Sequence, residues 1–208
     1  MAMDVMTAAA RIEQSGRHVV HMELGQPAAP APSMAVAAAQ AALAGGRLGY
    51  TESLGLPNLR RRIARHYQDA YGVAVDPATV IVTTGSSAAF TLAFLSLLEP
   101  GDRVGLAAPA YPPYRHILTA LGCEPALIRL SPESRYALTP HALLDAHREK
   151  PLKAVLIASP ANPTGTMMSA EALADLVGAA EDTGIAVISD EIYHGLDYAF
   201  PATTALAA

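Results

Sequence analysis

A carboxylate and a carboxamide stand at positions that favour ligand binding. Asp190 comes directly after the expected buried strand Ile185–Ser189, where an unpaired charge would be costly. It needs a cationic partner, and no lysine or arginine lies near it in the sequence. Asn162 begins an Asn-Pro-Thr-Gly segment and presents both a donor and an acceptor, although those four residues alone also fit a plain turn.

Ser86 and Ser87 form a second candidate site. They follow Gly85 between an expected strand and an expected helix, so backbone N–H groups, the helix dipole and two hydroxyls converge as in phosphate sites. A serine before a helix is more often a plain N-cap, and the pattern alone allows both interpretations.

A sheet must position these segments, because strand patterns alternate with helical patterns from residue 79 onward. The expected strands are Val80–Val82, Val104–Ala107, Ala126–Leu130, Ala154–Ala158 and Ile185–Ser189, with helices expected over Ala88–Leu98, Tyr114–Leu121, Pro140–His147 and Ala170–Thr183. This alternation predicts an α/β fold with a mostly parallel sheet covered by helices on both faces. Ligands bind outside the carboxyl ends of such strands, where the polar residues above lie. Before the sheet we expect helices over residues 3–15, 33–44 and 58–71, and a short strand over Val19–Leu24.

The composition argues against several classes of protein. A net charge of -5, with no basic cluster beyond Arg60, Arg61 and Arg62, indicates no nucleic-acid partner. No apolar run approaches ~18 residues and the start of the chain lacks the apolar stretch of a signal peptide, so we expect no membrane partner and a cytoplasmic location. Cys123 is the single cysteine, which excludes a disulfide framework.

Six segments, taken in their order and spacing, give the chain a resemblance to the N-terminal part of class I/II aminotransferases of fold type I, which use pyridoxal 5'-phosphate. They are Gly25-Gln26-Pro27, Gly49-Tyr50, Gly85-Ser86-Ser87, Pro109-Ala110-Tyr111, Asn162-Pro163-Thr164-Gly165 and Asp190-Glu191-Ile192-Tyr193. No single segment is decisive, but the set covers essentially the whole chain. The resemblance implies a homodimeric enzyme that moves an amino group between an amino acid and a 2-oxo acid.

By that resemblance the polar residues gain roles toward the cofactor ring. Asp190 would pair with the protonated pyridine nitrogen, which would supply the cation that this carboxylate needs. Asn162 and Tyr193 would donate to the phenolic oxygen of the ring, and Tyr111 would stack on the ring face. Taken alone, each tyrosine fits half-buried packing better.

Further roles concern the phosphate and the substrate. Ser86 and Ser87 would hold the phosphate with backbone amides and a hydroxyl, and Tyr50 would reach the phosphate in the neighbouring subunit. Gly25 would offer its backbone to the substrate carboxylate, and Asn162 would also contact the substrate. The same resemblance divides the chain into residues 1–48, an arm with part of a small domain, and residues 49–208, a partial cofactor-binding large domain.

The resemblance also implies a Schiff-base lysine in a Ser-x-Ser-Lys motif after the Asp-Glu-x-Tyr strand, followed by two arginines. The 208 residues hold no such motif, and Lys150 and Lys153 stand at the start of a strand, away from the ligand edge. A non-catalytic truncated remnant is therefore an alternative, as is a lyase or synthase of the same fold. The family sheet also places two later strands between its first strand and the strand ending near Ala158, so a central gap is expected.

Two other chemistries fit less well. Ser87, Asp190 and His194 follow the chain order of an α/β-hydrolase triad, but Ala89 breaks the G-x-S-x-G elbow. Asp190, Glu191 and His194 offer metal ligands, yet adjacent side chains at a strand end point to opposite faces, so we expect no metal.

We expect the 208-residue chain by itself to lack transaminase activity. A positioned base for proton transfer at the substrate α-carbon typically contributes ~10²–10⁴-fold, and the expected lysine is not among these residues. The purified chain is to be assayed with pyridoxal phosphate against a panel of amino acids and 2-oxo acids. Sustained turnover above that of free cofactor would contradict this expectation.

Overall fold

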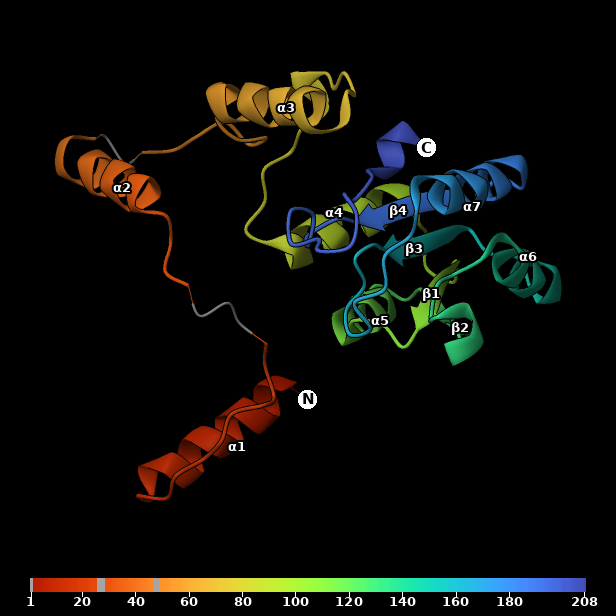
Figure 1. Ribbon diagram of the computed structural model, residues 1–208, viewed down its shortest axis with the longest axis horizontal. Coiled ribbons are helices and arrows are strands. Elements are labelled where there is room, and N and C mark those ends of the chain that lie inside the picture. Colours follow the sequence, from red (N-terminus) through yellow and green to blue (C-terminus); the bar gives the residue numbers. More distant parts are fainter. Residues whose placement is uncertain (1, 26–28, 47–48) are drawn as a thin grey trace. The chain divides into compact units, whose positions relative to one another are not determined.

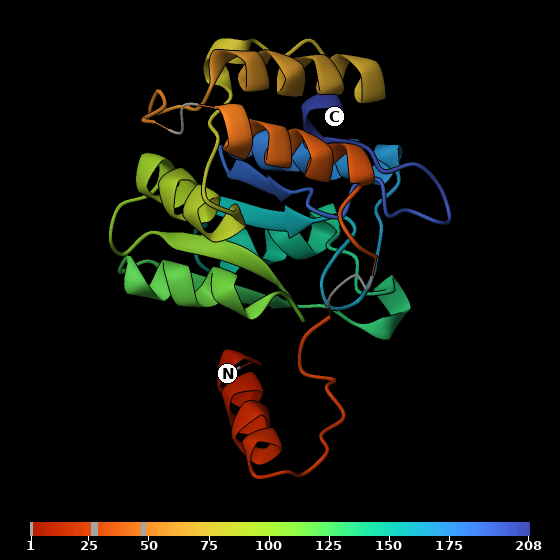
Figure 2. The ribbon, with the colours of Figure 1, turned by 90° about the vertical axis from the view of Figure 1, so that its left-hand side faces the viewer.

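Four apolar segments pair into a parallel sheet in the computed structural model, which describes residues 2–25, 29–46 and 49–208. The strands are β1 (Arg103–Ala108), β2 (Glu124–Arg129), β3 (Ala154–Ala158) and β4 (Ala186–Asp190), in the order β2-β1-β3-β4. Every pairing is parallel. Figure 2 shows β3 and β4 side by side and running in the same direction.

Helices connect the strands and cover the sheet. They are α4 (Ser86–Leu97), α5 (Pro112–Ala120), α6 (Pro140–Glu149) and α7 (Ala170–Asp182). The helix α3 (Pro57–Tyr71) precedes them in the chain, and the short 3₁₀ turns are η1 (Pro77–Thr79), η2 (Pro132–Ser134) and η3 (Ala205–Ala207). Proline opens α3, α5 and α6, since its missing N–H has no partner at that position. Thr139 and Ser169 accept bonds from the first turns of α6 and α7. Within the ranges that the structure describes, no helix is long and apolar enough to cross a membrane.

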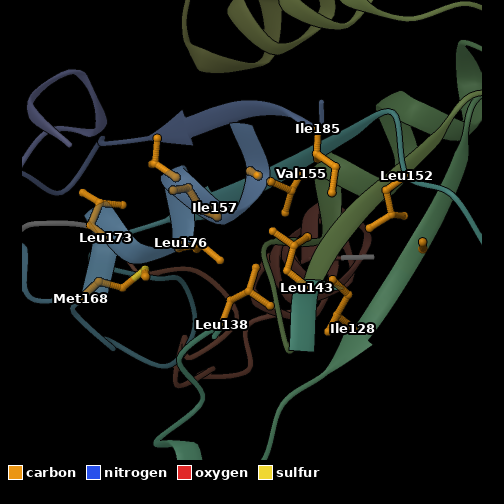
Figure 3. Packing of buried hydrophobic residues seen from close by; sticks show 13 residues of the cluster. Ile128, Leu138, Leu143, Leu152, Val155, Ile157, Met168, Leu173, Leu176 and Ile185 are labelled. Carbon is orange, nitrogen blue, oxygen red and sulfur yellow. The ribbon is translucent and has the colours of Figure 1, made fainter. Parts of the chain in front are cut away.

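Two hydrophobic layers hold the helices to the sheet. Phe90 and Phe94 of α4 and Leu118 of α5 pack on one face, with Val104 and Leu106 of β1. The helices α6 and α7 pack on the other face, on the opposite side of the ribbon from α4 and α5 (Figure 1). Figure 3 shows this second layer, in which side chains of β3 gather with leucines of α6 and α7. An α/β fold with a parallel sheet covered on both faces is thus confirmed.

The chain divides into the units Met1–Tyr50 and Thr51–Ala208. The first contains α1 (Ala2–Gln14) and α2 (Ser33–Gly45). His21 forms hydrogen bonds with Glu23 and Glu13, which raise the pKa of His21 to about 9.

The expected strand Val19–Leu24 is wrong, because the described residues of this segment form no strand. Alternation alone does not make a strand where no second strand offers ladder partners.

Val80–Val82 is extended but is likewise not a strand in the described sheet. Two hydrogen bonds from outside the sheet hold its backbone. The Val82 N–H donates to the Leu54 carbonyl at 3.0 Å, and Arg60 Nε donates to the Val80 carbonyl at 2.8 Å. Arg60 therefore has a structural contact, whereas Arg61 and Arg62 are exposed.

The expected gap beside the strand Ala154–Ala158 is wrong. β4 pairs with β3 along that edge, from Ala154 with Ala186 to Ala158 with Asp190. β4 is instead one of the two edge strands of the described sheet, and a groove of about 690 Å³ runs along it. Tyr67 of α3 and Val177 of α7 contribute to its walls.

Three leucines in register on neighbouring strands differ in how deeply they are buried. Leu106 of β1 pairs with Leu127 of β2 and Leu156 of β3, so the three side chains share one face. Leu106 is 2% exposed and Leu127 is 51% exposed. Leu106→Ala should lower the free energy of unfolding by about 2–5 kcal/mol, and Leu127→Ala by about 1 kcal/mol or less. Urea unfolding of both variants measures this, and equal losses would contradict the layering.

Candidate functional site

Three polar residues follow three neighbouring strands of the sheet. Tyr111 comes after β1, Asn162 after β3, and Asp190 is the last residue of β4. Because these strands are adjacent and parallel, their carboxyl ends meet at one edge. The structure thus gathers all three predicted residues at the edge where ligands bind in such folds.

Asp190 is held by two neutral donors. The Tyr114 hydroxyl makes a short hydrogen bond to Oδ2, and the Ile192 N–H donates to Oδ1 at 3.1 Å. No cation of the described chain pairs with this carboxylate. Lys150, one of the two lysines, instead pairs with Glu124 at 2.6 Å. The two polar contacts of Asp190 within the described chain are thus a hydroxyl and a backbone amide, and the cationic partner implied for it stays a prediction.

Tyr114 is a site residue that the sequence pattern did not indicate. It is 3% exposed, and its ring meets Tyr111 edge-on with centroids 5.4 Å apart and Phe90 edge-on at 5.0 Å. Burial, and then the hydrogen bond to the charged Asp190, raise the pKa of Tyr114 far above its usual value, so its hydroxyl stays protonated. The available signal was its position three residues after Tyr111, one helical turn along α5.

Asn162 and Tyr193 approach each other across the edge. The Asn162 side-chain amide donates to the Tyr193 hydroxyl at 3.4 Å, and both residues are half-buried. The bond is long, so the amide N–H and the hydroxyl proton both remain able to donate to an oxygen placed between them.

Ser86 and Ser87 are the first two residues of α4 and are exposed. The N-cap residue is Gly85, at a φ of 87°, and no side chain caps the helix. The N-cap interpretation of the serines is therefore wrong. The first backbone N–H groups of α4 lack partners inside the helix, as in anion sites. Phe90, one turn further on, touches Tyr114, which places the start of α4 on the same side as Asp190.

Gly25 and Tyr50 belong to the unit Met1–Tyr50, and both are exposed. Gln26 and Pro27, which complete the motif of Gly25, lie outside the described residues. The roles implied for Gly25 and Tyr50 stay predictions.

His194 has a structural role. Its Nε2–H donates to the Ser159 carbonyl at 3.0 Å, and the Tyr71 hydroxyl lies 2.7 Å from its Nδ1. Since the carbonyl can only accept, Nε2 carries a proton, and the Tyr71 hydroxyl is the hydrogen-bond partner of Nδ1. Both ring nitrogens are thus engaged, which leaves neither for a nucleophilic serine. The contacts tie α3 to the loops that carry Asn162 and Tyr193.

This fold defines an α/β protein with a polar site at the carboxyl edge of a parallel sheet. Within that class, the chain belongs to the aminotransferase class I and II family, whose family model matches residues 17–207. The predicted family resemblance is confirmed.

Individual relatives agree with the family assignment. A valine–pyruvate aminotransferase of Mycobacterium tuberculosis is 47% identical over 94% of this chain and 50% of its own length. The crystal structure of an aminotransferase from the same organism matches with a TM-score of 0.89 and 46% identity, over 98% of this chain and 52% of that one. Aspartate aminotransferase from Thermus thermophilus with maleate matches with a TM-score of 0.92 and 29% identity, over 99% and 54%. The chain spans about half the length of these relatives.

The link from Tyr71 to His194 can be tested by removing one hydroxyl. Tyr71→Phe leaves Nδ1 of a mostly buried imidazole without its donor, so the free energy of unfolding should fall by about 1–3 kcal/mol. Tyr67→Phe is the control, because no hydrogen bond of the Tyr67 hydroxyl occurs within the described part of α3 and its neighbours. Chemical denaturation of both variants measures the difference, and a loss as large in the control would show that Nδ1 gains nothing from Tyr71.

Proposed function

We propose that the full-length protein is an aminotransferase that moves an amino group between an amino acid and a 2-oxo acid through pyridoxal 5'-phosphate. Family membership supports the reaction class. The observation that carries the proposal is the hydrogen-bonded pair of buried Tyr114 and half-buried Asp190 at the carboxyl end of β4, beside the uncapped start of α4.

The described residues fit three polar groups of the cofactor, namely its phosphate, its ring nitrogen and its phenolic oxygen. The uncapped N–H groups of α4 and the two exposed serines suit a phosphate. Asp190 has one hydrogen bond on each oxygen, so each oxygen can accept another from a ring N–H. Asn162 and Tyr193 offer two donors for a phenolic oxygen.

When bound, pyridoxal phosphate supplies a ring that withdraws electrons from the substrate α-carbon. Asp190 holds the proton on the ring nitrogen, because its negative charge favours the protonated form. Asn162 and Tyr193 donate to the phenolic oxygen and keep it anionic. Tyr111 covers one face of the ring and keeps water from it.

Further parts of the proposal rest on the family resemblance. Residues 1–48 supply an arm and part of a small domain, and residues 49–208 supply much of the cofactor-binding domain. The full-length protein is a homodimer in which Tyr50, exposed in this chain, reaches the phosphate bound by the other subunit. Gly25 and Asn162 contact the substrate.

The name of one relative suggests the first substrates to assay. Because a 47% identical relative is a valine–pyruvate aminotransferase, valine and pyruvate are the first pair, followed by alanine, aspartate and 2-oxoglutarate. The full-length protein should convert one of these amino acids to its 2-oxo acid. Borohydride reduction should fix the cofactor to the protein, and a protein without fixed cofactor would refute the proposal.

Asp190→Asn keeps the shape of the side chain and removes its charge. The ring nitrogen should then lose its proton, and turnover of the full-length protein should fall by about 10²-fold or more, as when other groups that stabilise developing charge are lost. Asp175→Asn, an exposed change on α7, is the control and should retain normal turnover. Steady-state kinetics measure both, and near-normal turnover of Asp190→Asn would show that Asp190 is not the ring-nitrogen partner.

A further inference from the structure

Tyr114 joins two residues that the proposed function places on the cofactor. Its hydroxyl donates to Asp190 Oδ2, and its ring meets Tyr111 edge-on at 5.4 Å and 79°. It is almost fully buried, and the phenyl ring of Phe90 packs edge-on against it from α4. The packing leaves Tyr114 little freedom to turn away from Asp190.

We infer that Tyr114 is a positioning residue that aims the Asp190 carboxylate at the ring nitrogen of the cofactor. This inference rests on the proposed function. In this role Tyr114 acts through Asp190, to which its hydroxyl donates.

The bonds to Asp190 fix the plane of its carboxylate. Tyr114 binds Oδ2 and the Ile192 N–H binds Oδ1, so rotation about the Cβ–Cγ bond would break both contacts. A carboxylate that accepts from two fixed donors is held in one orientation, which a ring N–H can meet without a cost in side-chain entropy.

The protonation of Tyr114 supports this role. The phenol stays neutral, since burial and the adjacent carboxylate both oppose the phenolate. The neutral Tyr114 hydroxyl donates to the Asp190 carboxylate. Because it carries no negative charge, it does not attract a cation away from Asp190. Tyr114 therefore remains a hydrogen-bond donor to the Asp190 carboxylate.

The test compares two ligands that differ at one atom. Dissociation constants are measured by equilibrium dialysis for pyridoxal 5'-phosphate and for its 1-deaza analogue, in which C–H replaces the ring nitrogen. In the full-length protein, Tyr114→Phe should weaken binding of pyridoxal phosphate about tenfold, from the loss of one hydrogen bond to a charged group. Binding of the analogue should change less than about twofold, because it offers Asp190 no N–H.

Two further variants make the comparison specific. Tyr198→Phe is the matched control, since Tyr198 is 97% exposed, and it should alter neither constant. Tyr114→His restores a ring N–H donor and should recover part of the preference for pyridoxal phosphate. It also serves as the test variant if Tyr114→Phe does not fold.

The outcomes separate the inference from the proposed function. If wild-type protein does not bind pyridoxal phosphate, the proposed function fails. If wild-type protein binds and Tyr114→Phe weakens both ligands equally, Tyr114 acts only in packing and the inference is overturned. Unchanged binding of both ligands would overturn it as well.

Discussion

The pairing of β3 with β4 is the constraint on which the site depends. The register runs from Ala154 with Ala186 to Ala158 with Asp190, so it fixes where the chain leaves the sheet. Side chains alternate between faces along a strand, and a slip of one residue would turn Asp190 to the opposite face. The carboxylate in its place would then be Glu191. The backbone ladder, more than any side chain, decides which acid meets Tyr114.

The two neighbouring acids have different surroundings for this reason. Asp190 faces α5 and accepts from one hydroxyl and one amide. Glu191 Oε1 accepts from the Ser189 and Thr204 hydroxyls and from the Ala205 N–H at 2.8 to 3.1 Å. Three donors on one oxygen make Glu191 a tether for the chain near η3, while Asp190 retains acceptor capacity for a ligand.

The local apolar pattern of the sequence predicted the strands β1 to β4 and the helices between them. These predictions held because each of the four strands also has a partner in the sheet. Val19–Leu24 shows the same local pattern without a partner, and it forms no strand. Tyr114 could not be assigned from the sequence, since its role depends on Asp190, 76 residues away, and on Phe90 from another helix. The serines of α4 were ambiguous for a similar reason, because a cap and a phosphate site share one local pattern.

The edge of β4 that faces the groove is open to pairing with a further strand. Its backbone groups have no strand partner within the described sheet, and the strand ends in Asp190. A strand that paired there would support β4 from its second side and so steady Asp190. Pairing along this edge of β4 and the fixing of Asp190 in its position would then occur together.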